Sequence, residues 1–277
     1  MTSLAGQTIL ITGATDGLGR ALAEELAHGG ATVLVHGRDR SRIATAIDGI
    51  RAATGSERLR PYLADFADLA QVRALAEQVI AAEQRLDVLV NNAGIGATVP
   101  GGGARMESAD GYELRFAVNY LAGFLLTRLL LPLLRSSAPA RIINVSSLGQ
   151  QAIDFDDVML TASYNGVRAY CQSKLAQILF TFDLAGQLAG QDVTVNALHP
   201  ATYMPTKIVA SPYSTIEEGV AATLRLVAAP ELAGVTGRFF NGQHEASPDP
   251  QARDAHAWER LRELSEKLTG LLPAPLP

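Results

Sequence analysis

Cysteine is nearly absent from this sequence: Cys171 is the only one among 277 residues. A single cysteine excludes an internal disulfide and favours a reducing compartment, so we expect a cytoplasmic protein. A strong excess of charge is also missing, because the net charge is −5 and the pI is about 5.6. This balance argues against nucleic acid as the main partner. The five histidines are scattered without metal-ligand spacing, so we expect no metal site.

Long hydrophobic runs are missing as well. The first residues carry neither a basic segment nor a long apolar stretch, so we expect no signal peptide. The longest apolar stretch, 121–134, is short for a bilayer and contains Arg128 and Pro132. We therefore expect a buried core helix there and no membrane span.

What the sequence does contain is an alternation of short and long apolar patterns. Continuous β-branched runs, typical of buried parallel strands, occur at 8–12, 31–36, 59–64, 86–91, 140–146, 192–198 and 237–242. Helical patterns occur at 17–29, 39–53, 68–84, 108–135, 165–189, 215–229 and 250–269. This alternation predicts a single α/β domain over 1–277, a Rossmann-like doubly wound sheet of seven parallel strands with helices on both faces.

A glycine-rich segment follows the first predicted strand. In "TGATDGLG" (12–19) Gly13, Gly17 and Gly19 fall where the chain must turn from strand to helix. The start of that helix offers free N–H groups and the positive end of its dipole, which suit the pyrophosphate of a dinucleotide. Glycines also serve such turns without a ligand, but the place after the first strand favours the cofactor.

The end of the second strand bears on which cofactor is bound. Gly37 stands where NAD enzymes usually place an acid, and Arg38, Arg40 and Arg42 follow it. Cations at a helix N-terminus are unfavourable for the dipole, so they suggest an anion such as the 2′-phosphate of NADP. We expect NADP(H) rather than NAD(H). The alternative is a solvated basic turn that Asp39 partly neutralises.

Tyr170 and Lys174 lie one helical turn apart in "RAYCQSKLAQILF". Both could simply extend from a core helix to solvent. A proton-transfer pair explains them better, because they follow a strand that ends in paired serines. Lowering the pKa of a tyrosine from about 10 by two to three units takes about 3–4 kcal/mol. One cation at about 4–5 Å, with an effective dielectric near 20, supplies about that much. We therefore expect Lys174, helped by the positive nicotinamide of a bound cofactor, to lower the pKa of Tyr170.

Six motifs stand in order along the chain: "TGATDGLG", "NNAG" (91–94), Asn119 in "FAVNYLAGF", "NVSS" (144–147), "YCQSK" (170–174) and "HPAT" (199–202). Together they resemble the short-chain dehydrogenase/reductase family over almost the whole chain. Finer features, such as "RDRSRI" and "SYNGVRAYCQSKLAQILF", resemble the branch of retinol dehydrogenases and the WW-domain oxidoreductase.

The resemblance implies a role for individual residues. Tyr170 would be the general acid–base, Ser147 would bind the substrate oxygen, and Lys174 would hold the nicotinamide ribose. Asn119 would kink its helix and seat a water in a proton relay to Lys174. The implied cofactor contacts are Gly13, Thr15, Asp16, Gly17, Leu18, Gly19, Arg38, Asp65, Phe66, Asn92, Ala93, Gly94, Tyr170, Lys174, Pro200 and Thr202.

Some residues depart from the family pattern or copy it in the wrong place. Ala201 replaces a usual glycine, and either Thr202 or Thr206 could contact the nicotinamide amide. Tyr164 and Arg168 repeat the Tyr–Lys spacing, but arginine is a poor substitute for a compact ammonium, so we expect a structural or pocket-wall role for Tyr164. Ser146 should point away from the face that Ser147 occupies.

Two further regions would border the substrate. We expect a lid over about 203–229. The acidic "DFDD" (154–157) either disfavours acidic carriers or is an ordinary solvated loop.

The expected protein is thus an NADP-dependent oxidoreductase that acts on a small-molecule carbonyl or alcohol, apolar or lipid-like, by a Ser-Tyr-Lys-Asn mechanism. Alternatives are a catalytically weak NADP(H)-binding sensor or scaffold and, less in keeping with the glycine motif, an epimerase or dehydratase. The helices around 112–134 and 168–188 are apolar over more than one face, which predicts a homodimer.

Overall fold

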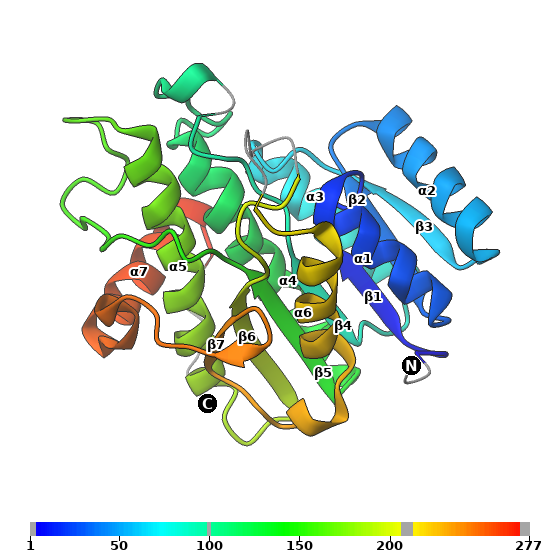
Figure 1. Ribbon diagram of the computed structural model, residues 1–277. Coiled ribbons are helices and arrows are strands. Elements are labelled where there is room, and N and C mark those ends of the chain that lie inside the picture. The colour runs from blue at the N-terminus through cyan, green and yellow to red at the C-terminus, as the bar shows by residue number, and fades with distance from the viewer. Residues whose placement is uncertain (1–3, 99–100, 206–212, 272–277) are drawn as a thin grey trace.

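The computed structural model describes residues 4–98, 101–205 and 213–271. Its strands are β1 (Thr8–Ile11), β2 (Thr32–Gly37), β3 (Leu59–Leu63), β4 (Val88–Asn91), β5 (Ala140–Val145), β6 (Val193–His199), β7 (Arg238–Asn241) and β8 (His244–Glu245). They form one sheet in the order β3-β2-β1-β4-β5-β6-β7-β8 (Figure 1). The strands from β3 to β7 pair in parallel. The predicted doubly wound sheet is confirmed, with the two-residue β8 added antiparallel to β7.

Helices cover both faces of the sheet. They are α1 (Gly17–His28), α2 (Arg40–Thr54), α3 (Leu69–Ala82), α4 (Ala122–Ser136), α5 (Gly166–Gln187), α6 (Ile216–Ala228) and α7 (Ala255–Thr269). Alternate strand residues face opposite cores: Ile9 and Ile11 pack with α1, α2 and α6, whereas Leu10 packs with α3, α4 and α5. This two-sided burial explains why the strand sequences are continuously apolar.

The helix predicted over 108–135 begins later than its sequence pattern indicated. Residues around Gly111 (φ +81) form a turn, and Glu107 pairs with Glu113 in an isolated β-bridge. A π-helix over Phe116–Leu121 then leads into α4. The stretch Phe116–Ser136 is long and apolar enough to cross a membrane, but 67% of its most apolar window is buried inside the fold.

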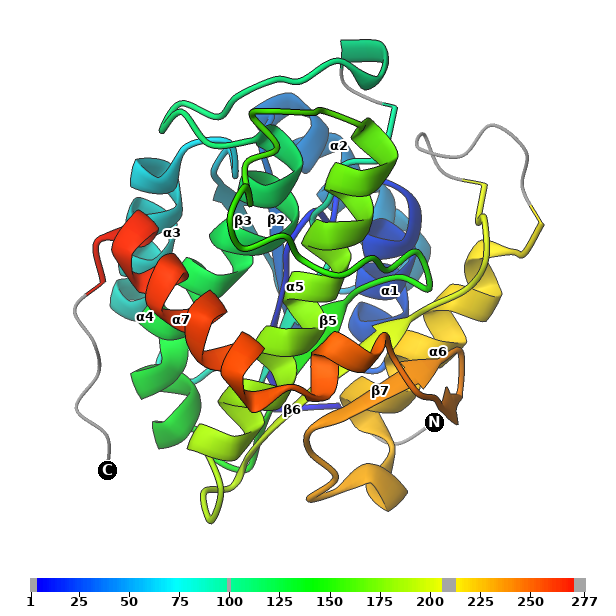
Figure 2. The same ribbon diagram turned by 90° about the vertical axis from the view of Figure 1, so that its left-hand side faces the viewer.

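The C-terminal helix lies across the outside of α5 (Figure 2). Tyr120 Oη and Ser265 Oγ are 2.7 Å apart, and Arg262 Nη1 donates to Asp183 Oδ1 at 2.5 Å. The helix starts at Ala255, later than the predicted residue 250, because Asp254 caps it by accepting from the His256 N–H. Helix α7 therefore packs on α5, one of the two helices on which the homodimer expectation was based.

Candidate active site

The glycine segment forms a tight cradle between β1 and α1. Gly13 has a φ of +67°, which favours glycine, and a Cβ there would lie 2.9 Å from Ala93 Cα. A Cβ on Gly19 would lie 2.3 Å from the Gly13 carbonyl oxygen. Thr15 and Leu18 point their side chains into packing contacts with Gly37 and Gly219. The backbone thus approaches itself closely at the start of α1, where the positive end of the helix dipole favours an anion.

Thr12 and Asn92 fasten this cradle to the loop after β4. The Thr12 hydroxyl oxygen accepts from the backbone N–H groups of Asn92 and Ala93 at 2.9 and 3.0 Å. Asn92 Nδ2 donates to the carbonyl oxygens of Thr12 and Gly13 at 2.8 and 3.2 Å. The predicted residues Gly13, Asn92 and Ala93 are therefore brought together at the carboxyl ends of β1 and β4.

His36 is a residue of this end of the site that the sequence analysis missed. Its Nδ1 accepts from the Gly13 N–H at 3.1 Å, and its Nε2 lies 3.1 Å from the Ala64 carbonyl oxygen, to which it donates. Its ring stacks on Phe66 with centroids 4.5 Å apart, so the Phe66 side chain is part of the core. Burial lowers the pKa of His36 to about 4, partly opposed by the Ala64 hydrogen bond and Asp65. The neutral imidazole holds the glycine loop in place.

The basic turn after β2 leaves no room for an acid. A Cβ on Gly37 would lie 2.6 Å from Thr15 Cγ2. Arg38, Arg40 and Arg42 are exposed. Asp39 caps α2 by accepting from the Arg42 N–H at 3.0 Å, while Arg42 Nη2 donates to Asp16 Oδ2 at 3.0 Å.

The other acids of this region have their own roles. Asp16 accepts from the Gly17 N–H as the N-cap of α1. Asp65 Oδ1 accepts from the Ala67 N–H at 3.0 Å, which shapes the turn after β3. One of the three arginines is thus paired with an acid of the glycine segment.

Ser147, Tyr170 and Lys174 meet beyond the carboxyl end of β5. Ser147 Oγ accepts from the Gly149 N–H at 3.0 Å. A Cβ on Gly149 would lie 3.4 Å from Ser147 Oγ and 3.6 Å from Tyr170 Cε1, so the two side chains lie side by side. Lys174 is buried, and its Nζ lies 5.8 Å from the centre of the Tyr170 ring. A Cβ on Gly94 would lie 3.5 Å from that Nζ. The second serine, the tyrosine and the lysine therefore share one site beside the loop after β4.

The direction expected for the Tyr170 pKa is wrong in this structure. Burial raises the pKa of Tyr170, and the nearby Ser147 hydroxyl only partly opposes this rise. Lys174 Nζ instead donates to the Val145 carbonyl oxygen at 2.9 Å and to Gln177 Oε1 at 3.1 Å. Burial lowers the pKa of Lys174 to about 8. Desolvation of the phenol thus outweighs one cation that is itself desolvated and bonded elsewhere, and Tyr170 is held as a neutral proton donor.

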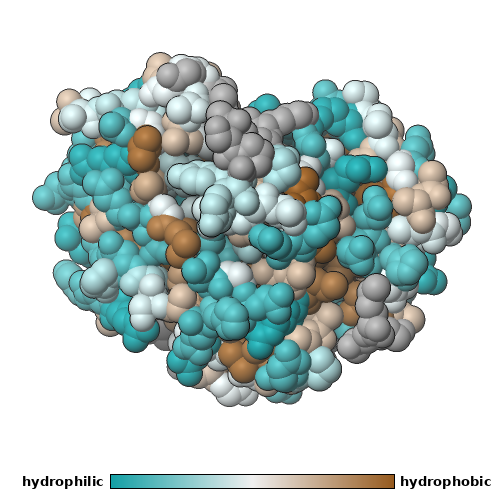
Figure 3. Space-filling view, in the orientation of Figure 1, coloured by the Kyte–Doolittle hydropathy of each residue, from teal (hydrophilic) through white to brown (hydrophobic). Residues whose placement is uncertain are grey.

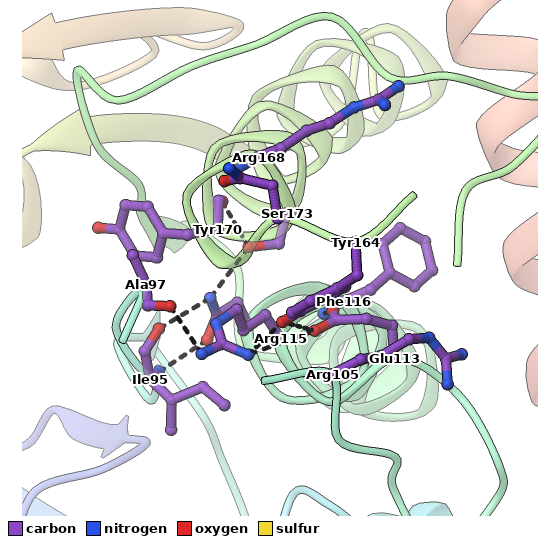
Figure 4. A network of polar contacts seen from close by, with 12 residues as sticks. Ile95, Ala97, Arg105, Glu113, Arg115, Phe116, Tyr164, Arg168, Tyr170 and Ser173 are labelled. Atoms are coloured by element: carbon purple, nitrogen blue, oxygen red, sulfur yellow. Dashed lines mark hydrogen bonds and ion pairs between the residues drawn. The ribbon is translucent and has the colours of Figure 1, made fainter. Parts of the chain in front are cut away.

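Asn119 lies inside the π-helix, in keeping with the irregular helix expected at this residue. Its Oδ1 accepts from the Ile95 N–H at 2.7 Å, and its Nδ2 donates to the Ile95 carbonyl oxygen and to Ser173 Oγ at 3.1 and 2.9 Å. Figure 4 labels Ile95, in the loop after β4, and Ser173, on α5, which are the residues that this amide joins. The side chain of Asn119 therefore joins two parts of the site.

The segment after β6 carries Pro200, Ala201 and Thr202. Among the described non-glycine residues, Leu160 and Tyr203 have positive φ and Ala201 does not, so its backbone does not need glycine. His199 Nε2 lies 3.1 Å from Thr202 Oγ1. Burial and the nearby Lys174 lower the pKa of His199 to about 4.

The predicted lid over 203–229 lies partly within the described residues. Thr206 and residues 207–212 lie outside the described residues, whereas the rest of the predicted lid includes α6. Of the two threonines expected to contact the nicotinamide amide, Thr202 lies within the described residues.

Ser146 and Tyr164, which resemble the catalytic serine and tyrosine in the sequence, have structural roles. Ser146 Oγ donates to the Lys174 carbonyl oxygen at 2.7 Å, away from Ser147. The Tyr164 hydroxyl lies 2.5 Å from Arg115 Nη1 and donates to Glu113 Oε1 at 3.1 Å. Burial, followed by the nearby Glu113 charge, raises the pKa of Tyr164 to about 12.

The acidic segment 154–157 is partly neutralised within the chain. Arg168 pairs with Asp154 at 3.0 Å, and Arg260 lies 3.6 Å from Asp156. Asp157 accepts from the Thr161 and Ala162 N–H groups. These contacts favour an ordinary structural loop over a surface that repels acidic carriers.

The described residues fit a nicotinamide dinucleotide. The glycine cradle lies at the positive N-terminal end of α1, which suits a pyrophosphate. Exposed arginines lie at one end of this cradle, and Tyr170 and Lys174 lie at the other. Ligand sites in parallel sheets lie at the carboxyl ends of strands where the strand order reverses. Here that point lies between β1 and β4.

Comparisons with known proteins agree with this geometry. The family model of the short chain dehydrogenases matches residues 7–216. Human retinol dehydrogenase 13 is 40% identical over 290 residues, which cover 97% of this chain and 86% of that protein. Human retinol dehydrogenase 14 is also 40% identical, with 96% and 87% covered.

Solved structures are similar as well. A protein of Mycobacterium paratuberculosis has a TM-score of 0.80 and 30% identity, covering 100% of this chain and 97% of its own. A Shigella flexneri protein described as a short chain dehydrogenase, complexed with NADP, has a TM-score of 0.70 and 26% identity, covering 87% and 98%.

Proposed function

The chain belongs to the short-chain dehydrogenase family and is an alcohol/carbonyl oxidoreductase of that family, and we propose that it uses NADP(H) to interconvert an apolar, lipid-like alcohol and its carbonyl compound. The convergence of Ser147, Tyr170 and Lys174 beside the glycine cradle carries this proposal. A bound nicotinamide would supply or accept the hydride.

The chain's own residues would manage the oxygen and the proton. Ser147 Oγ would bind the substrate oxygen, and the neutral Tyr170 hydroxyl would donate its proton to that oxygen during reduction. Lys174, now bonded to Val145 and Gln177, would hold the nicotinamide ribose. A tyrosine kept neutral by burial suits the reductive direction, because the acid form is the one that gives a proton.

The choice of NADP(H) is supported by the turn after β2. An acid at position 37 would collide with Thr15, and exposed Arg38 and Arg40 can meet a phosphate. The Shigella flexneri protein was solved with NADP.

An apolar substrate is supported by Leu148 next to Ser147 and by Tyr203, which are 46% and 64% exposed. Tyr203 is near enough to raise the pKa of Tyr170 slightly. The names of the retinol dehydrogenase relatives point to the same kind of substrate.

The test is a panel of apolar and polar alcohols, aldehydes and ketones, assayed by NADPH and NADH absorbance. We expect turnover with apolar substrates and NADPH, and its loss in Tyr170→Phe. Purified protein that binds the cofactor but turns over no member of the panel would favour the sensor or scaffold alternative.

A cytoplasmic location and a homodimer are further proposals. The dimer would need surface beyond the face that α7 covers, so light scattering at micromolar concentration is the direct measurement. A scattering mass of one chain would refute the dimer.

A further inference from the structure

Arg115 is a fully buried arginine that the proposed mechanism does not use. Its side chain has 0% exposure, and its guanidinium donates to the carbonyl oxygens of Gly96 at 3.0 Å and Ala97 at 2.7 Å. A third hydrogen bond goes to the Tyr164 hydroxyl at 2.5 Å (Figure 4). Glu113 Oε1, 3.5 Å from Nη1, balances the charge. The planar guanidinium group thus holds three hydrogen-bond acceptors in fixed positions.

The two carbonyl groups belong to the loop that passes Lys174. Gly94, at the start of this loop, comes close enough that a Cβ would lie 3.5 Å from Lys174 Nζ. Asn119, four residues after Arg115, binds Ile95 through both its amide atoms. At the far end, a Cβ on Gly166 would lie 2.3 Å from the Ala97 carbonyl oxygen. The loop is therefore held between the π-helix and the first turn of α5.

Stability alone is a weak reason to bury such an ion pair. Removing a guanidinium and a carboxylate from water is unfavourable, and well-packed apolar residues often stabilise a core equally well or better. What an apolar side chain cannot do is fix the carbonyl groups of two successive residues in direction.

We propose that Arg115 is a positioning residue: together with Asn119 it holds residues 95–97 against α5, so that the nicotinamide half of the cofactor binds in register with Tyr170 and Lys174. This inference rests on the proposed function, since it assigns the loop to the nicotinamide end. Among the described residues, the Arg115 side chain forms its hydrogen bonds and ion pair with Gly96, Ala97, Tyr164 and Glu113, and none with Gly13, His36 or Arg38 of the adenosine end.

Arg115→Lys is the most direct test, because lysine keeps the charge beside Glu113 but cannot bind three acceptors in a fork. Two ligands would be titrated against it: NADPH, and adenosine 2′,5′-bisphosphate, which lacks the nicotinamide half. We expect the Kd for NADPH to rise about tenfold, as lost hydrogen bonds to a charged group do. The Kd for the bisphosphate should change less than about twofold. General damage to the fold would weaken both ligands together.

Arg128→Lys is the matched control. Arg128 lies on the same helical stretch, is 10% exposed, donates to Gln187 Oε1 at 2.8 Å and lies 3.6 Å from Glu266, away from the site. Arg128→Lys should leave the Kd for NADPH and the Kd for the bisphosphate unchanged. Should Arg115→Lys fail to fold, Tyr164→Phe removes one partner of the fork and keeps the ring, and should raise the NADPH Kd about two- to threefold with the bisphosphate unaffected.

The outcomes separate this inference from the function on which it rests. Wild-type protein that binds neither NADPH nor NADH would overturn the proposed function and the positioning role with it. Wild type that binds NADPH, with Arg115→Lys either equal to it or weakened for both ligands alike, would overturn the role of Arg115 alone.

Discussion

The two ends of the proposed cofactor site hold their charges in different ways. At the adenosine end Arg38, Arg40 and Arg42 are exposed to solvent. At the nicotinamide end Lys174 and Arg115 are buried. Exposed charges are screened by water and salt, whereas buried charges act in a low dielectric and shift one another's pKa. The first arrangement suits recognition of a cofactor, and the second suits control of geometry and proton transfer.

The largest expected effect lies at the buried end. Tyr170→Phe removes the proton donor and keeps the ring, so turnover should fall by about 10²–10⁴ while cofactor affinity stays within a few-fold. Steady-state kinetics on a substrate found in the panel, with NADPH titration, would show both. Retention of most of the turnover would refute the assignment and leave another acid to be found.

Lys174→Met extends that comparison, since Lys174 is assigned a cofactor contact as well as a place beside Tyr170. We expect both turnover and NADPH affinity to fall, with affinity reduced about tenfold or more. Unchanged NADPH affinity would remove the ribose contact from its role.

At the exposed adenosine end we expect a smaller effect, a loss of binding affinity for NADPH alone. Arg38→Ala should weaken NADPH binding by about 1–3 kcal/mol and leave NADH nearly unchanged, because a charge-assisted contact to the 2′-phosphate is lost. The preference of the wild-type protein for NADPH over NADH should also decrease at high salt. Arg51→Ala is the control, because Arg51 lies on α2, the helix that follows Arg38, but pairs with Asp48 and Glu57. Tighter wild-type binding of NADH than of NADPH would overturn the cofactor assignment.

The adenosine end and the nicotinamide end each contain a buried neutral histidine. We expect the two ends to differ least in how these histidines affect stability at low pH. The folded pKa of His36 and of His199 is about 4, below the ordinary 6.5. The unfolded chain therefore takes up protons first, so stability from these groups is complete above about pH 6.5 and is lost as pH falls toward about 4. Between about pH 7 and pH 5 each should contribute a loss of about 2 kcal/mol.

Urea unfolding at those two pH values would measure this dependence. His36→Gln and His199→Gln should each remove about half of it, whatever they do to stability at neutral pH. A pH dependence that both variants leave intact would show that other groups cause the acid destabilisation.

The sequence by itself determined the features that depend on local spacing. Alternating apolar patterns identified the strands and helices of the sheet, and glycines after β1 located the cradle. The one-turn spacing of Tyr170 and Lys174 placed both on one helix, and the alternation of side chains along a strand separated Ser146 from Ser147. These inferences hold because helical and strand periodicities follow from the backbone alone.

Only the tertiary structure decided what each buried group faces. It placed His36 under Gly13 and Arg115 on the Gly96 and Ala97 carbonyl groups, across 23 and up to 19 residues of sequence. It also reversed the direction expected for the Tyr170 pKa, because desolvation depends on which groups pack around the phenol. The tertiary structure likewise packed α7 against α5. Burial and long-range partners arise from packing, and a residue's neighbours in the chain do not reveal them.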